Sequence, residues 1–507
     1  MSNFDSTDIE YYLGRYSLGR DSNPRNIMDS LHFLRFKVPG GFLTSGQFRG
    51  IAELTKTYSK GLAEITDRED IQLHWIKSED SLKIFSIMDK LGFTTDMCGQ
   101  GFGGARYGDA RNIICCPVMG IDENEIMDGR ALMSKLTNFL VGNPDFLNMP
   151  KKFKFSISGC GNDCTRGITN DLAYIGVKKG EDIGYTLFIG GSAGSTRPGP
   201  RLAKRLHVFI PPEDAFDLGI AMIEIHRDHS NRETKAKARF KWLVNEWGVE
   251  KIKDMIEEKL GKKLEPYNGP TFYGNSNHEG IHPQKQEGLF YFNVPIIGGR
   301  MTYKEMIFFA DIADKYGSGE LRLTPTQNII IHNIKQRDVV LKLLEKNNFS
   351  FNGPLLKWSS IGCSSDFCGK SMEPHAKDFT KEIVNFLIEN YNTTLLNDSG
   401  IIIKVNGCPN HCCASSLAEI GLSGAITKNK KGESIQAFDI VLGGGIEPNP
   451  SLGRVIERHV PHSQIIPIIA NLIQNYIETK SDKENFREFC NKKTEEELKI
   501  ILNKKIK

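Results

Sequence analysis

The sequence predicts an α+β protein in which one arrangement occurs twice, each copy consisting of a small α/β sandwich followed by a larger α/β domain. Two observations lead to this prediction. Strand-like and helix-like segments alternate at the start of the chain, and three motifs of the first half recur in the same order in the second. Two copies of one unit predict a pseudo-twofold fold whose central turns face each other and can enclose a ligand.

The alternation is clearest in the first compact segment. Residues 33–38 alternate like a strand, residues 47–60 have helical periodicity, residues 70–76 read as a second strand, and residues 81–91 as a second helix. This βαβ-like order predicts a sandwich of ferredoxin-like type.

The repeat rests on three matched pairs of segments. The offsets are 255 from Gln72 to Gln327, 248 from Cys160 to Cys408, and 253 from Gly191 to Gly444. Three ordered matches at nearly one offset indicate an internal duplication. The pairs are Ile65–Gln72 with Leu321–Gln327, Ser158–Cys164 with Asn406–Cys412, and Phe188–Gly191 with Val441–Gly444.

The domain boundaries follow from the repeat and from breaks in periodicity. Residues 215–260 are amphipathic and charged, which predicts helical packing, and the Pro and Gly residues of segment 262–277 separate the halves. The predicted units are an N-terminal arm (1–30), ferredoxin-like half-domains (31–98 and 278–350), larger domains (105–262 and 355–480) and a C-terminal tail (481–507).

Composition excludes several classes of protein. The chain has 507 residues, 39% of them hydrophobic and 25% charged, which is typical of a globular protein with several domains. A net charge of +3 without a basic stripe argues against nucleic-acid binding. No apolar stretch reaches about 18 residues and no export signal is visible, so we expect a cytoplasmic protein with no membrane span.

Two cysteine pairs of the second half suggest a metal centre. Cys363 and Cys368 precede Cys408 and Cys412, and the second pair lies in a turn containing Gly407 and Pro409. Four thiolates in turns rich in backbone amides are typical of a [4Fe-4S] cluster. Because the spacing also suits structural zinc, zinc and buried free thiols stay open as alternatives at this stage.

The first half carries an incomplete copy of this pattern. Cys160 and Cys164 match the second pair, but Cys115 and Cys116 are adjacent and cannot reproduce the first. We therefore expect a structural remnant here rather than a second cluster. We interpret Cys98, Cys413 and Cys490 as plain thiols.

Four cations of the first half form a candidate anion pocket: Arg68, Arg111, Lys152 and Lys154. Lys152 and Lys154 alternate, so both point to one face of an extended segment. Scattered cations often form only a solvated face, but a half without a cluster can supply guanidinium groups for an oxyanion and lysines for protons.

Two other patterns are set aside. His278-Glu-Gly-Ile-His282 has the spelling of a zinc-protease motif, but Gly280 and Pro283 argue against the helix that this motif requires. The glycine clusters lack the Gly-Lys-Ser/Thr ending of a phosphate-binding loop, and we find no strand-GxGxxG-helix unit for a nicotinamide or flavin.

Taken together, these residues resemble the ferredoxin-dependent nitrite and sulfite reductases over residues 30–480. The motifs on which the resemblance rests are Arg68 to Gln72, Arg111 to Cys116-Pro117, Lys152-Phe-Lys154, Arg322-x-Thr324-x-x-Gln327, Cys363 to Cys368, and Asn406-Gly-Cys408-Pro-Asn410-x-Cys412. The resemblance implies a sirohaem coupled to a [4Fe-4S] cluster, and the six-electron reduction of sulfite to sulfide or nitrite to ammonia. With no flavin or nicotinamide module, it implies electrons from ferredoxin or a similar donor protein.

The resemblance also assigns roles to residues. It implies that Cys363, Cys368, Cys408 and Cys412 bind the cluster, that Cys412 bridges to the sirohaem iron, and that Arg68, Arg111, Lys152 and Lys154 bind the anion. It places Gln72, Arg322, Thr324, Gln327 and Asn410 near the tetrapyrrole. Lys154 favours sulfite, while a dedicated nitrite reductase and a non-catalytic iron–sulfur carrier stay as alternatives.

Overall fold

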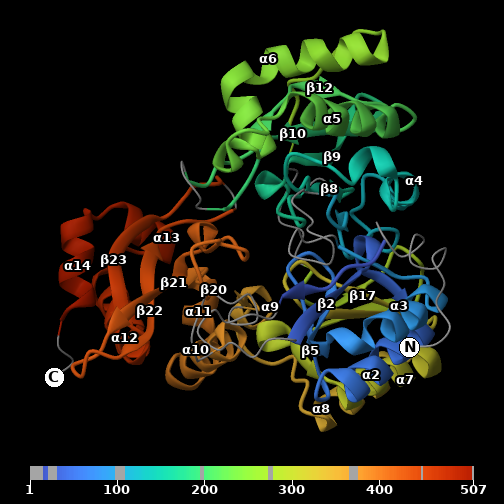
Figure 1. Ribbon diagram of the computed structural model, residues 1–507. Helices are drawn as coiled ribbons and strands as arrows, with labels where there is room; N and C mark the ends of the chain where they lie inside the picture. The colour runs from blue at the N-terminus through green and yellow to red at the C-terminus, as the bar shows by residue number, and fades with distance from the viewer. Residues whose placement is uncertain are drawn as a thin grey trace.

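The computed structural model describes residues 15–20, 31–96, 109–160, 162–194, 199–271, 278–364, 375–446 and 449–504. The chain forms three lobes (Figure 1). The two ferredoxin-like segments, blue and yellow, make one lobe together, and the larger domains, green and orange to red, make the other two.

The first ferredoxin-like segment contains the strands and helices expected from the sequence. Thr44 begins α2 with a reciprocal capping box, because its side chain accepts the Gln47 amide and the Gln47 side chain accepts the Thr44 amide. The predicted elements at 33–38, 47–60, 70–76 and 81–91 correspond to β2, α2, β5 and α3. The elements are β2 (Leu31–Lys37), α2 (Ser45–Tyr58), β4 (Leu62–Ile65), β5 (Ile71–Lys77), α3 (Ser81–Lys90) and β6 (Thr94–Thr95).

The second ferredoxin-like segment repeats this order. Thr302 and Glu305 form the same capping box at the start of α7 that Thr44 and Gln47 form at α2. The elements are β14 (Gly280–Pro283), β15 (Phe290–Val294), α7 (Tyr303–Tyr316), β17 (Glu320–Leu323), β18 (Ile329–Ile334) and α8 (Arg337–Lys346).

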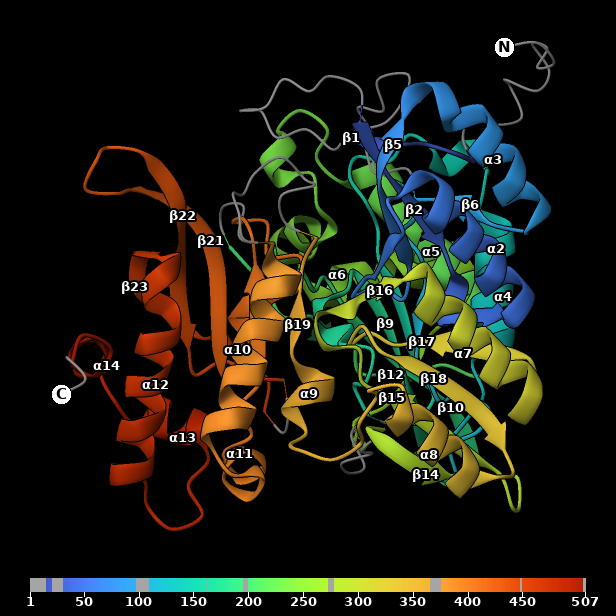
Figure 2. The same cartoon turned by 90° about the horizontal axis from the view of Figure 1, so that it is seen from below.

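The two segments exchange one strand each. Strand β3 (Phe42–Thr44) of the first pairs with β17, and β16 (Arg300–Thr302) of the second pairs with β4. Helices α2 and α7 lie side by side (Figures 1 and 2), and one core joins Phe36 and Phe48 to Phe292 and Phe309. The predicted half-domains 31–98 and 278–350 are therefore one structural unit.

The first larger domain is a mixed sheet covered by helices. Strands β7, β8 and β9 are parallel, whereas β10 and β11 run antiparallel. The predicted helical segment 215–260 forms two helices, α5 and α6, which pack together in the green lobe of Figure 1. The elements are β7 (Ile114–Cys115), α4 (Arg130–Leu140), β8 (Phe155–Ser158), β9 (Leu172–Lys179), β10 (Asp182–Ile189), β11 (Lys204–Arg205), β12 (Val208–Phe209), α5 (Ala215–His229), α6 (Phe240–Leu260) and β13 (Glu265–Pro266).

The second larger domain has the same sheet pattern. Strands β19, β20 and β21 are parallel, and β22 and β23 antiparallel. Helix α10 packs on β19 and β20, and α12 packs on β22 and β23. The elements are α9 (Leu356–Ser359), β19 (Ile361–Gly362), α10 (Ala376–Asn390), α11 (Thr393–Ser399), β20 (Ile403–Asn406), β21 (Ile420–Lys428), β22 (Ser434–Leu442), β23 (Arg454–Pro461) and α12 (His462–Thr479).

The duplication extends to individual hydrogen bonds in two hairpin turns. In the turn at 66–70, the Asp70 amide donates to Thr66 Oγ1 at 3.2 Å; in the turn at 324–328, the Asn328 amide donates to Thr324 Oγ1 at 3.0 Å. Glu69 and Gln327 both have left-handed backbone, with φ of 61° and 66°. The two turns are thus equivalent, residue for residue.

This equivalence corrects one match made from the sequence. The counterpart of Gln327 is Glu69, at an offset of 327 − 69 = 258, and not Gln72 at 255. Gln72 lies inside β5, whereas Gln327 lies in the turn before β18. The short similarity around the two glutamines matched a strand residue to a turn residue.

Both predicted chain ends contain packed structure. Within the predicted arm, Tyr16 and Leu18 are buried and β1 (Gly19–Arg20) pairs with β2; residues 1–14 and 21–30 lie outside the described part. The predicted tail contains α13 (Phe486–Asn491) and α14 (Glu495–Leu502), which complete the core of the second larger domain. The expectation that the second domain ends near residue 480 was wrong, because its core needs these side chains. None of the helices in the described ranges is long and apolar enough to cross a membrane.

Replacing Phe489 with alanine should destabilise the second larger domain. Its side chain is 1% exposed and its ring lies 5.3 Å from that of Tyr476, so the change leaves a cavity that costs about 3–5 kcal/mol. The matched control is Ile500→Ala on α14, where a 71% exposed side chain should change stability by less than about 0.5 kcal/mol. Calorimetric unfolding midpoints measure both, and equal midpoints would contradict the packing described for α13.

Candidate active site

The ends of two parallel strands bring the second-half cysteines together. Strands β19 and β20 are neighbours, with Gly362 beside Val405, so the residues that follow them meet at one edge of the sheet. The Cys363 amide donates to the Val405 carbonyl at 3.0 Å, and Cys408 follows the end of β20 at Asn406. The topology of the sheet, rather than chain proximity, makes these cysteines neighbours.

The loop around Cys408 directs a backbone amide at a cysteine sulfur, as a cluster-binding turn does. The Gly407 amide donates to Cys363 Sγ at 3.1 Å. A Cβ at Gly424 would lie 2.1 Å from the Gly407 carbonyl carbon, so the loop needs glycine where it crosses β21. Cys408 is buried and Cys412 exposed.

The thiols of this loop act on one another electrostatically. Burial raises the pKa of Cys363, and the neighbouring Cys413, Cys412 and Cys408 raise it further. Several thiols near enough to raise the pKa of Cys363 suit a shared metal centre, so the described residues are compatible with a cluster. Cys368, the fourth predicted ligand, lies outside the described residues, as does Cys98.

Arg68 lies in the hairpin turn at 66–70, between the ferredoxin-like lobe and the first larger domain. It is 7% exposed, and its Nη1 donates to Asn170 Oδ1 at 2.9 Å. Its Nη2 donates to the carbonyls of Asn112 and Phe155. Its Nε has no hydrogen-bond partner within the described ranges, so the guanidinium retains a donor that the surrounding protein does not use.

Arg111 belongs to the same charged group through Asp96. Arg111 Nη1 lies 3.2 Å from Asp109 and 4.0 Å from Asp96. Although burial alone would raise the pKa of Asp96, the charges of Lys37, Arg111 and others hold it below its usual value. Asp96 and Asp109 thus offset part of the positive charge of these cations.

The two lysines extend this group. The Lys154 amide donates to Asp171 Oδ2 at 3.0 Å, which fixes the chain just before β8. Burial, followed by the charges of Arg68 and Lys152, lowers the pKa of Lys154 to about 7. The four cations predicted from the sequence therefore lie in one electrostatic group.

The hairpin turn at 66–70 links the cations to the cysteine loop. The charge of Asp67, next to Arg68, raises the pKa of both Lys154 and Cys413. Arg166 donates to the Asp67 carbonyl at 3.3 Å, and also to the Pro325 carbonyl in the equivalent turn of the second half. One hairpin turn therefore interacts electrostatically with a candidate anion-binding lysine and with a cysteine next to Cys412.

The residues predicted near the tetrapyrrole are mostly buried in protein contacts. Gln72 accepts two hydrogen bonds from Arg35, at 2.9 and 2.7 Å. Gln327 Nε2 donates to the Gly362 carbonyl at 2.8 Å, directly before Cys363. Thr324 Oγ1 accepts a hydrogen bond from the Asn328 amide. Within the described structure, Gln72 and Thr324 therefore stabilise the ferredoxin-like lobe, and Gln327 stabilises the end of β19 before Cys363.

Arg322 and Asn410 differ from each other in exposure. Arg322 is 1% exposed, and its Nη1 donates to the carbonyls of Pro117 and Met119 at 3.0 and 2.7 Å. Burial lowers its pKa to about 10. Asn410 is exposed in the cysteine loop. A role in tetrapyrrole binding stays a prediction for all five residues.

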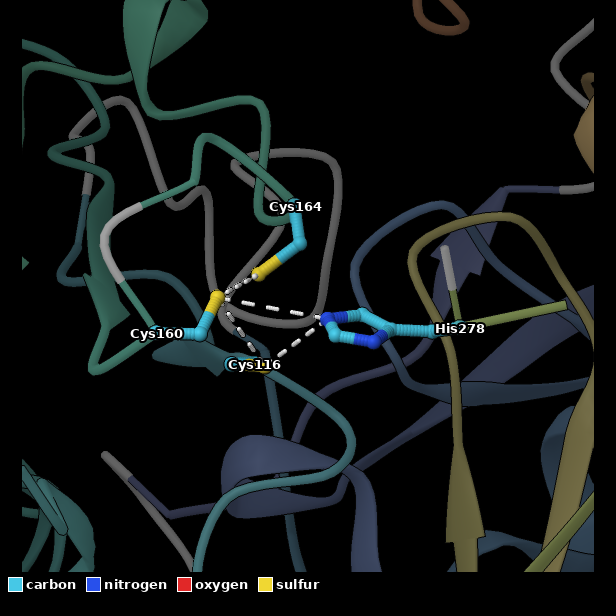
Figure 3. Close-up of side chains that lie close together, drawn as sticks. All are labelled: Cys116, Cys160, Cys164 and His278. Carbon is cyan, nitrogen blue, oxygen red and sulfur yellow. Dashed lines mark hydrogen bonds between the residues drawn. The ribbon is translucent and has the colours of Figure 1, made fainter. Parts of the chain in front are cut away.

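Sequence reasoning missed a second group of possible metal ligands: Cys116, Cys160, Cys164 and His278 (Figure 3). Of the two adjacent cysteines, only Cys116 belongs to this group. A signal was present: the offsets 363 − 116 = 247, 408 − 160 = 248 and 412 − 164 = 248 nearly agree. His278 precedes strand β14, and His282 lies within it. The two histidines therefore do not lie on one helix, in agreement with the decision to set the zinc-protease motif aside.

Comparison with known proteins identifies two family domains. The domain described as "Nitrite and sulphite reductase 4Fe-4S domain" matches residues 107–264. The domain described as "Nitrite/Sulfite reductase ferredoxin-like half domain" matches twice, at residues 28–91 and 282–346. The double match agrees with the internal duplication and with the single lobe that the two segments form.

Individual relatives agree along most of their length. The assimilatory ferredoxin-dependent nitrite reductase of Haloferax mediterranei is 31% identical, covering 92% of this chain and 82% of the relative. Sulfite reductase [ferredoxin] 1 of Mycolicibacterium paratuberculosis is 28% identical, covering 94% and 85%. The structure of the Mycobacterium tuberculosis NirA protein superposes with a TM-score of 0.85 at 26% identity, covering 98% of this chain and 92% of that one. The chain therefore belongs to the family of ferredoxin-dependent nitrite and sulfite reductases.

Proposed function

We propose that this protein reduces sulfite to sulfide or nitrite to ammonia by six electrons, using a [4Fe-4S] cluster and a sirohaem and receiving electrons from ferredoxin or a similar protein. The observation that carries the proposal is Asp67 of the hairpin turn at 66–70, whose charge raises the pKa of Lys154, one of the four cations, and of Cys413, next to Cys412. The names of relatives at about 30% identity support both substrates.

The cluster ligands in this proposal are Cys363, Cys368, Cys408 and Cys412. When bound, the cluster and sirohaem supply electrons one at a time to the anion. The exposure of Cys412, compared with the burial of Cys408, supports its assignment as the ligand nearest the sirohaem. The Gly407 amide that donates to Cys363 Sγ would stabilise thiolate charge there.

The cations of the first half bind the oxyanion and move protons. Arg68 and Arg111 present guanidinium groups, which suit anionic oxygens. Lys154, with a pKa of about 7, can hold a proton on Nζ for binding and release it near neutral pH. Asp96 offsets part of the positive charge, which lowers the cost of holding these cations close together.

Two substrate assignments compete. Lys154 favours sulfite by its resemblance to sulfite-reducing members, whereas several relatives, including those of Oryza sativa and Arabidopsis thaliana, are named ferredoxin–nitrite reductases. Kinetics on both anions with reduced ferredoxin should decide between them. The purified holoprotein should show a Soret band and consume at least one anion; iron and sulfide without a Soret band or turnover would favour the non-catalytic electron carrier.

Replacing Lys154 with asparagine should move the preference toward nitrite. The variant loses one charge-assisted contact to the sulfite oxygens, which is worth about tenfold or more in kcat/KM. The measurement is the ratio of kcat/KM values for sulfite and nitrite, with Lys152→Asn as the neighbouring control. An unchanged ratio would remove Lys154 from the specificity assignment.

The pH dependence should report on Lys154. Its pKa is lowered from the ordinary value of 10.5 to about 7, so the free enzyme loses this positive charge as pH rises through about 7. We expect kcat/KM for the anion to fall above that pH, since kcat/KM follows the free enzyme. In Lys154→Arg the charge persists, and the fall should move to higher pH; identical profiles would show that another group is responsible.

Replacing Cys412 with serine should abolish the reduction of both anions. If Cys412 joins the cluster to the sirohaem, the variant should also change the Soret band, while Cys413→Ser should leave both the band and the activity near wild type. Visible spectra and reduction with methyl viologen measure this. An active Cys412→Ser enzyme with an unchanged spectrum would disprove the bridging assignment.

A further inference from the structure

We propose that Cys116, Cys160, Cys164 and His278 bind a structural zinc ion. The ion links the first larger domain to the start of the second half of the chain. This site lies outside the reductase chemistry proposed above. It would take a single divalent ion of the zinc class, held by three thiolates and one imidazole, which is a common ligand set of structural zinc.

The distances between the ligand atoms match one tetrahedral ion. Zinc binds sulfur at about 2.3 Å and imidazole nitrogen at about 2.0 Å, so sulfurs around one ion lie about 3.8 Å apart and a sulfur and a nitrogen about 3.6 Å apart. Cys160 Sγ lies 3.8 Å from Cys116 Sγ and 3.6 Å from Cys164 Sγ. His278 Nε2 lies 3.6 Å from Cys116 Sγ and 3.9 Å from Cys160 Sγ, and all four atoms lie within 4.8 Å of one another.

The same geometry argues against a second [4Fe-4S] cluster. In a cluster each thiolate binds a different iron, so the ligands lie farther apart than around one ion. The fourth cluster ligand of the second half, Cys368, corresponds by the offset of 247 to Ile121, because 368 − 247 = 121. Ile121 is a buried apolar side chain that cannot bind iron. The first half thus retains three of the four thiols and adds His278 from another direction.

The protein holds these ligands in place from several sides. Cys116 follows β7, and Cys160 and Cys164 lie between β8 and β9, so the parallel strands deliver them to one edge. Arg322 of β17 donates to the carbonyls of Pro117 and Met119, which fixes the loop after Cys116.

Neighbouring side chains also hold His278 in place. Asn293 Nδ2 donates to the His278 carbonyl at 2.9 Å. The Asp122 carboxylate lies 4.0 Å from His278 Nδ1, leaving Nε2 to face the sulfurs, as in carboxylate–histidine–zinc arrangements.

The burial of the site and its place in the chain point to a structural role. Cys116, Cys160 and His278 are 1%, 6% and 7% exposed, so little space is left for a substrate on the ion. His278 lies 118 residues after Cys160 and 162 after Cys116. An ion bound by these segments cross-links residues that are far apart in the chain. Because a cross-link that closes a long loop restricts the unfolded chain more than one that closes a short loop, the ion should stabilise the fold.

Metal analysis of the full-length holoprotein tests the proposal. Wild type from zinc-replete growth should contain about one zinc per chain beside its iron. Cys160→Ser should lose most of the zinc and keep iron and the Soret band, whereas Cys408→Ser, the equivalent change in the second half, should lose iron and keep zinc. Zinc X-ray absorption should show three sulfurs and one nitrogen.

Two variants of His278 keep the test decisive if Cys160→Ser does not fold. His278→Cys supplies a fourth thiolate and should retain zinc with four sulfurs, whereas His278→Ala should lose zinc and unfold at lower temperature. Wild type without zinc, full zinc in Cys160→Ser, an unchanged absorption spectrum in His278→Cys, or iron at this site in Cys408→Ser would each overturn the proposal. Since zinc content and ligation are measured rather than turnover, the result is independent of the reductase assignment.

Discussion

The exchange of one strand between the two ferredoxin-like segments is the constraint on which the rest of the structure depends. Because β3 completes the sheet of the second segment and β16 that of the first, neither sheet is complete alone, and the two segments share one core. This fixes the two hairpin turns at 66–70 and 324–328. Glu69 accepts the amide of Cys115 at 2.9 Å, and Gln327 contacts Gly362. Each turn therefore supports the strand that precedes a proposed metal-ligand cysteine of its own half, Cys116 or Cys363.

The group of cations around Arg68 and Arg111 shows how the protein keeps buried charges close together. Arg68 and Arg111 are less than 10% exposed, and Asp96 is 2% exposed between them and Lys37. Charges in such surroundings cost several kcal/mol each unless they are paired. The network is tolerated because Asp96 offsets part of the charge and backbone carbonyls accept from Arg68. Burial, and after it the charges of Arg68 and Lys152, lowers the pKa of Lys154.

The two larger domains share one backbone arrangement around their cysteines. Arg166 and Ala414 adopt the same left-handed backbone, with φ of 52° and 53°, after Cys164 and Cys412. Gly176 and Gly424 lie against Gly159 and Gly407 in the same way. What differs is the fourth ligand. Ile121 replaces a thiol in the first half, and His278 enters from the linker, so the same three cysteine positions converge on a smaller site.

Local patterns in the chain were sufficient to predict the duplication, the first ferredoxin-like elements, the family, and the membership of Arg68, Arg111, Lys152 and Lys154 in one group. Such features depend on periodicity and on short motifs, both of which are formed by residues close together in the sequence. Tertiary structure decided the rest: the strand exchange, the equivalence of Gln327 with Glu69, the packing of residues 486–502 into a core, and the approach of His278 to Cys160. These depend on contacts between residues often more than 100 positions apart, and no local pattern encodes which distant side chain completes a site.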